Sequence, residues 1–181
     1  MLKLRLIDPE NLIPSANVAA EAAARRIEVL VIGHLRRRNE STSPKAGFPK
    51  SNYYAKASKN VAASAAGRVA RVEIDYPGVA MHYEGGTVRP KKKALAIPIN
   101  PAVAGIWPSE AGGVATGGAD DERYAMIWPK GSSHGFIKDT ETNDLLWLLV
   151  PKATIPADPS VLPGDGEILG AAEDAVWEAV S

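Results

Sequence analysis

Apolar residues recur at three- and four-residue spacing near the start of the chain and predict a long amphipathic helix from about Ala16 to Arg38. The stripe consists of Val18, Ala23, Ile27, Leu30, Val31 and Leu35. Ser15 is a suitable N-cap, and Arg36-Arg37-Arg38 places positive charge at the negative end of the helix dipole. At 1.5 Å per residue the helix is expected to be roughly 33 Å long. The β-branched stretch Ile27–Ile32 leaves a strand as the alternative.

Further along the chain the apolar period changes to two, which predicts antiparallel strands. Apolar and charged residues alternate over Arg68–Tyr76, as in a half-buried strand, and Pro77-Gly78 ends it. A strand over Ala94–Asn100 contains Pro98, which cannot donate to a ladder, so this strand is expected at a sheet edge or with a bulge. Three more strands are predicted, with a turn between the last two; they are Tyr124–Trp128, His134–Lys138 and Leu145–Val150, with the turn at Thr140–Asn143.

The segments between these elements are predicted to be loops, short helices and an arm. Proline and glycine indicate a loop over Asn39–Lys50, and the alanine-rich stretch Tyr53–Ala66 indicates a short helix. Glycine-rich Gly105–Asp121 lacks an apolar period and is expected to be a mobile insertion. Three prolines make Ala153–Gly166 an extended arm. An amphipathic helix over Glu167–Val180 is expected to use Leu169, Ala172, Val176 and Val180.

These elements predict an α+β fold in which the long N-terminal helix packs on a curled antiparallel β-sheet. An extended C-terminal arm and a short terminal helix follow the sheet. We expect a single α+β core domain over 1–152, with a flexible insertion at about 105–122, and the proline-rich arm and helix over 153–181. The tripeptides Ile106-Trp107-Pro108 and Ile127-Trp128-Pro129 are near-copies, but two tripeptides are too short to indicate a repeat architecture.

Composition favours a protein that associates. The 181 residues include 21 basic and 21 acidic side chains, so the net charge is zero. This balance argues against a general nucleic-acid binder and predicts self-association. The absence of cysteine excludes disulfides, thiolate nucleophiles and cysteine metal sites. No signal-peptide pattern and no apolar stretch of ~20 residues is present, so a soluble, cytoplasmic protein without a membrane partner is expected.

No residue pattern indicates a catalytic, cofactor or metal site. His34, His82 and His134 lack metal-ligand spacing, and Gly112–Gly118 lacks the Lys-Ser/Thr of a phosphate loop. The adjacent carboxylates of Asp120-Asp121-Glu122 diverge, which is unsuited to one cation. We therefore predict a protein that is not an enzyme and holds no cofactor. The basic runs Arg36-Arg37-Arg38 and Lys91-Lys92-Lys93 are either solvated charge or non-specific DNA contacts.

Two segments carry a resemblance to a known family. The run from Met81 to Lys91 (MHYEGGTVRPK), continuing through Lys93 to Ile99 (KALAIPI), resembles the virion-morphogenesis and tail-completion proteins of tailed bacteriophages. Leu145–Val150, then Ala153–Pro156 and Pro159, is similar to the late strand and proline arm of that family.

The resemblance implies a minor structural protein of a phage or prophage tail or neck: a tail-completion, tail-terminator or head–tail joining subunit. Such proteins assemble as rings, commonly of six copies, in the host cytoplasm, contact other tail or neck proteins, and become part of the virion. The family motif and expected subunit contacts are His82, Glu84, Gly85, Gly86, Arg89, Pro90, Lys91, Pro98, Ile155 and Pro156. The basic residues that would face DNA in the lumen are Lys91, Lys92 and Lys93.

We expect the loop Thr87–Lys93 and the arm Ala153–Pro163 to make the contacts between subunits. Two other classes of function stay open. A small protein- or nucleic-acid-binding module would be a monomer or dimer. An enzyme whose residues converge only in space, such as a histidine–carboxylate hydrolase, would have a deep polar pocket that joins two histidines.

Overall fold

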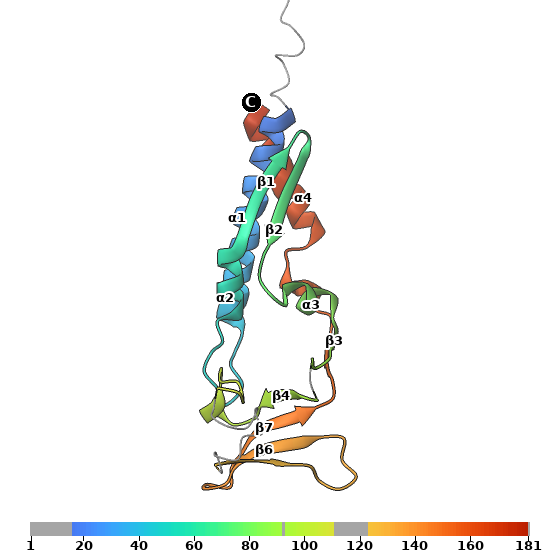
Figure 1. Cartoon of the computed structure of the whole chain (residues 1–181). Helices are drawn as coiled ribbons and strands as arrows, with labels where there is room; N and C mark the ends of the chain where they lie inside the picture. The colour runs from blue at the N-terminus through green and yellow to red at the C-terminus, as the bar shows by residue number, and fades with distance from the viewer. Residues whose placement is uncertain (1–15, 92, 111–122, 181) are drawn as a thin grey trace, which may run out of the picture. The chain divides into compact units, whose positions relative to one another are not determined.

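The computed structural model describes residues 16–91, 93–110 and 123–180 and shows a mixed α+β fold with a long N-terminal helix, antiparallel sheets and a C-terminal helix (Figure 1). The α+β prediction is confirmed. The described residues fall into two compact units. Unit 1 contains residues 16–42, 52–84 and 157–180, and unit 2 contains residues 43–51 and 85–156. This division differs from the expected core over 1–152, because the terminal helix packs with the N-terminal helix and the middle of the chain has a core of its own.

Unit 1 is built around the helix α1 (Ala16–Ser41). The antiparallel hairpin of β1 (Val61–Ala66) and β2 (Val69–Ile74) lies along α1, and so does α4 (Asp165–Val180) (Figure 1). Its smaller elements are α2 (Tyr53–Ala57), η2 (Ser58–Asn60), α3 (Val79–Glu84) and η4 (Pro159–Val161). The predicted long helix is confirmed, and the strand alternative at 27–32 is wrong.

Small residues let the elements of unit 1 approach α1 closely. Near its start α1 buries Ala20, Ala23 and Ala24, and α4 buries Ala175. Toward the C-terminal end of α1 the side chains become larger. There Val31 and Leu35 form a cluster with Tyr54, Ala57, Val79 and Val161. Such close packing of interdigitating side chains is typical of a protein core.

Three local predictions in unit 1 are corrected by the structure. The alanine-rich stretch 53–66 is helical only to residue 57, because β1 pairs with β2 and this pairing overrides the helix propensity of alanine. On α4 the predicted Leu169 is 60% exposed, and Ala175 is the buried residue. The helix itself, predicted from Glu167, begins at Asp165.

Unit 2 contains a four-stranded antiparallel sheet and a two-stranded ribbon. The sheet has the order β4-β7-β6-β5, made of β4 (Leu95–Pro98), β7 (Leu145–Val150), β6 (Gly135–Asp139) and β5 (Tyr124–Ile127). The predicted strands and the edge position of Pro98 are confirmed. The ribbon pairs β3 (Gly86–Val88) with β8 (Ala153–Ile155), so part of the expected arm is a strand. One turn of 3-10 helix, η3 (Pro101–Val103), follows β4.

The core of unit 2 lies under one face of the sheet. Trp147 is fully buried and Ile137 is 2% exposed, and they cluster with Val103, Leu146 and Leu149. The turn between β6 and β7 is held by the buried carboxylate of Asp139. Its Oδ1 accepts the backbone N–H groups of Glu141 at 2.9 Å and Thr142 at 3.2 Å, and Asn143 adopts a positive φ of 66°. The predicted turn at 140–143 is thus confirmed.

In the parts of the chain that the structure describes, no helix combines the length and apolarity needed to cross a membrane. The predicted insertion at 105–122 is described only to residue 110, so most of it lies outside the described residues.

Candidate functional site

The ribbon of β3 and β8 brings the two family-like segments together. Gly86 is the register partner of Ile155, although about seventy positions separate them in the sequence. Just before the ribbon, Gly85 has a φ of 75°, a conformation that glycine adopts without steric cost. On the unit 1 side, the backbone N–H of Asp158 donates to the carbonyl of His82 at 2.9 Å. The predicted motif is therefore partly assembled in space.

The other motif residues lie on several elements. His82 and Glu84 belong to α3 in unit 1. Arg89, Pro90 and Lys91 follow β3, Pro156 follows β8, and Pro98 ends the edge strand β4, where its register partner is Trp147. Lys93 is exposed, and Lys92 lies outside the described residues.

A polar cluster fastens the segment after β8 to the end of α1. The guanidinium of Arg38 pairs with the carboxylate of Asp158 and donates to the hydroxyl of Ser160 at 2.8 Å. It also lies 5.2 Å from the ring centroid of Tyr54. The hydrogen bond from the Ser160 hydroxyl and the charge of Arg38 hold the pKa of Asp158 below its ordinary value. The cluster stabilises unit 1 by joining residues far apart in the sequence.

The same cluster contains a serine, a histidine and an aspartate, but their geometry is that of a cap. His34 Nε2 lies 3.0 Å from the backbone carbonyl of Ser160, while the serine hydroxyl donates to Asp158 at 2.6 Å. In a Ser-His-Asp triad the histidine accepts the proton of the serine hydroxyl, whereas His34 meets the backbone carbonyl of Ser160. Here Asp158 instead caps η4, accepting the backbone N–H of Ser160 at 3.1 Å.

The ring of the motif residue His82 makes a different contact. It packs against the ring of Tyr53, with centroids 5.0 Å apart.

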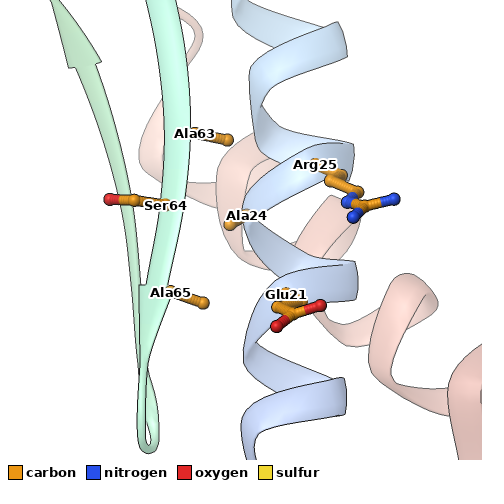
Figure 2. Close-up of a pocket in the computed structure, with 6 residues that line it drawn as sticks. All are labelled: Glu21, Ala24, Arg25, Ala63, Ser64 and Ala65. Atoms are coloured by element: carbon orange, nitrogen blue, oxygen red, sulfur yellow. The ribbon is translucent and has the colours of Figure 1, made fainter.

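A shallow pocket of about 240 Å³ lies between α1 and β1 (Figure 2). Ala63 and Ala65 point toward the helix and Ser64 points away from it, while Glu21 and Arg25 stand at the rim (Figure 2). The space arises because methyl groups face each other across the gap. One carboxylate and one guanidinium offer no acid–base pair or ligand set. Within residues 16–91, 93–110 and 123–180, no group of three or more His, Asp or Glu side chains could hold a metal ion.

A second groove, of about 350 Å³, belongs to unit 2 and includes two motif residues. We call it the Trp107 groove; it is lined by Pro90, Lys91, Ala94, Leu95, Ala96, Trp107, Pro108 and Ser109. The indole of Trp107 is 65% exposed. Its backbone N–H donates to Glu110 Oε2 at 3.0 Å, which fixes the turn that carries the indole. The lining is mainly apolar, with the cation of Lys91 at its margin.

Exposed tryptophans are the feature that the sequence analysis missed. Three of the four tryptophans lie at the surface: Trp177 is 71% exposed, Trp107 65% and Trp128 49%, whereas Trp147 is fully buried. The repeated Ile-Trp-Pro tripeptide was the available signal, since both copies carry an exposed indole followed by a proline.

Comparison of the chain with protein-family models, with curated proteins and with solved structures found no match. The resemblance to tail-completion proteins therefore stays a prediction, and the function has to be argued from the surfaces described above.

Proposed function

We propose that this protein is a structural subunit that assembles with copies of itself, as in the tail-completion, terminator or joining rings of a phage tail or neck. The observation that supports this proposal is the exposure of Trp107, Trp128 and Trp177. Aromatic side chains are enriched at protein interfaces, where burying them supplies much of the binding energy. Three exposed tryptophans on one subunit indicate that other proteins cover parts of its surface.

The proposed mechanism is mechanical. A ring forms when one surface of a subunit binds a different surface of the next and the rotation closes. The motif residues that follow the ribbon line part of the Trp107 groove, which supports the expectation that the loop 87–93 contributes to subunit contacts. Lys91 and Lys93 are exposed and can meet either a neighbouring subunit or the phosphates of DNA in a lumen.

The experiment is the mass of the purified protein in solution, measured by light scattering over a hundredfold range of concentration. We expect a closed oligomer of about six copies. The fraction of subunits in this oligomer should rise with concentration, and electron micrographs should show rings. Trp107→Ala should weaken the association, whereas Trp147→Phe, in the buried core, should leave the subunit number unchanged. A strict monomer at every concentration would contradict self-assembly. A stable dimer without larger species would favour the small binding module instead.

A further inference from the structure

The helix α4 presents an acidic and apolar face on the side away from α1. Leu169, Glu173 and Trp177 follow one another at four-residue spacing, and Leu169 and Trp177 are 60% and 71% exposed. Ala175, on the other side of the helix, is 4% exposed and faces α1. We call the outward residues Leu169, Glu173, Asp174 and Trp177 the α4 face.

The charge of α4 has one sign. The helix contains five acidic residues and no basic one: Asp165, Glu167, Glu173, Asp174 and Glu178. Glu178 is paired with Arg26 at 2.6 Å, and Glu167 accepts the backbone N–H of Gly164 at 3.1 Å. Glu173 and Asp174 are exposed, so a basic partner surface would complement the α4 face.

Two glycines on the same side of α4 point to close approach by another chain. Gly166 and Gly170 lie one turn apart, and an added Cβ at either would meet no atom of the described residues within 4 Å beyond the adjoining residues and backbone of α4 itself. Glycine inside a helix costs about 0.5–1 kcal/mol relative to alanine. Among the residues that the structure describes, none outside α4 occupies the space beside these two glycines.

The Trp107 groove lies in a basic part of the chain and has Lys91 in its lining. The stretch 85–109 contains four basic residues and no acidic one; the basic residues are Arg89, Lys91, Lys92 and Lys93. The first acidic residue after it, Glu110, is engaged by the backbone of Trp107. The groove volume of about 350 Å³ falls in the range of sites that take an aromatic group.

We infer that the α4 face of one copy docks into the Trp107 groove of the next copy. This inference rests on the proposed self-assembly and identifies its two surfaces. Trp177 and Leu169 pack against the apolar groove lining, and Glu173 and Asp174 meet Lys91 of the lining and the exposed Lys93 two positions further along the chain. Because the two surfaces differ, the contact can repeat from copy to copy, and it gives a ring when the rotation between copies closes. This contact also explains how a chain of zero net charge can associate with its own copies, since an acidic surface of one copy meets a basic surface of the next.

Charge reversal tests the contact between copies. One variant carries Glu173→Lys and Asp174→Lys, and a second carries Lys91→Glu and Lys93→Glu. Each variant alone opposes like charges at every contact, so we expect at least a roughly tenfold weaker association at low salt. A 1:1 mixture restores complementary charge at every contact of an alternating, even-numbered ring. The matched control, Lys59→Glu with Lys130→Glu, changes two exposed charges outside both surfaces.

The readouts are sedimentation velocity for association and circular dichroism for folding. Impaired assembly of each folded variant and its recovery in the mixture would support the docking. Wild-type association that neither variant weakens would overturn this inference while self-assembly stands, and so would two impaired variants that fail to recover together. A wild-type protein that does not associate would overturn both. A variant that does not fold is replaced by its milder form, Glu173→Gln with Asp174→Asn or Lys91→Gln with Lys93→Gln, for which a weaker association is again the supporting result.

Discussion

Replacing Leu35 by alanine is expected to destabilise unit 1 while leaving unit 2 unchanged. The Leu35 side chain is fully buried against Val31, Tyr54 and Val161. Truncating such a side chain removes its transfer free energy and leaves a cavity, which together cost about 2–5 kcal/mol. The core of unit 2, around Trp147, shares no residue with this cluster. The lost free energy should therefore be confined to unit 1.

Hydrogen–deuterium exchange read by mass spectrometry separates the two units in one experiment. Peptides from residues 26–41 should exchange roughly 30-fold to several thousandfold faster in the Leu35→Ala variant, because each 1.4 kcal/mol is about a factor of ten. Peptides from β7 should exchange at the wild-type rate. The control Val29→Ala truncates a side chain that is 66% exposed, and its effect should stay within about 0.5 kcal/mol.

Two outcomes would refute this reasoning. Equal acceleration in β7 would mean that the two units unfold as one cooperative body, despite their separate cores. Unchanged exchange in residues 26–41 would mean that Leu35 does not lie in a packed core in solution.

Three further predictions concern single contacts. Arg38→Ala removes the partner of Asp158, so limited proteolysis should cut residues 157–164 faster than in Arg36→Ala. The pKa of Asp158 is lowered in the folded protein. The stabilisation by the Asp158 carboxylate is therefore complete above the unfolded pKa of about 3.9 and is lost as the pH falls through the folded pKa. Asp158→Asn lacks this carboxylate, so its urea midpoint should fall less between pH 7 and pH 3 than that of the wild type. Gly135→Ala would place a Cβ 2.7 Å from the ring of Trp128; it should lower stability by about 1–3 kcal/mol in thermal unfolding, and Trp128→Ala should relieve most of that loss.

Local periodicity predicted the elements whose pattern is set by neighbours in the sequence. The apolar stripe of α1 and the alternation in β2 each depend on one buried side, so they can be read from the chain alone. The stretch 53–66 could not be read in this way, since alanine fits both a helix and the close hairpin that it forms beside α1. Its structure is decided by pairing with β2, a contact made later in the chain.

The candidate surfaces were less predictable than the elements. The predicted family motif included Gly86 and Ile155, but only strand pairing shows that they are partners. Nothing in the spacing of the tryptophans distinguishes the buried Trp147 from the exposed Trp177, because exposure depends on what the rest of the chain covers. The division into two units depends on the packing of α1 against α4, which lie at distant positions in the sequence.

The packing of α4 on α1 also affects the order in which the molecule can fold during translation. Most of unit 2, residues 85–156, is synthesised between α1 and α4, so α1 lacks its partner helix until the whole of that stretch has been made. Trp177 of the α4 face is synthesised seventy positions after Trp107 of the groove. A nascent chain that has not yet made α4 therefore lacks one of the two proposed contact surfaces, which would delay ring closure until α4 is complete.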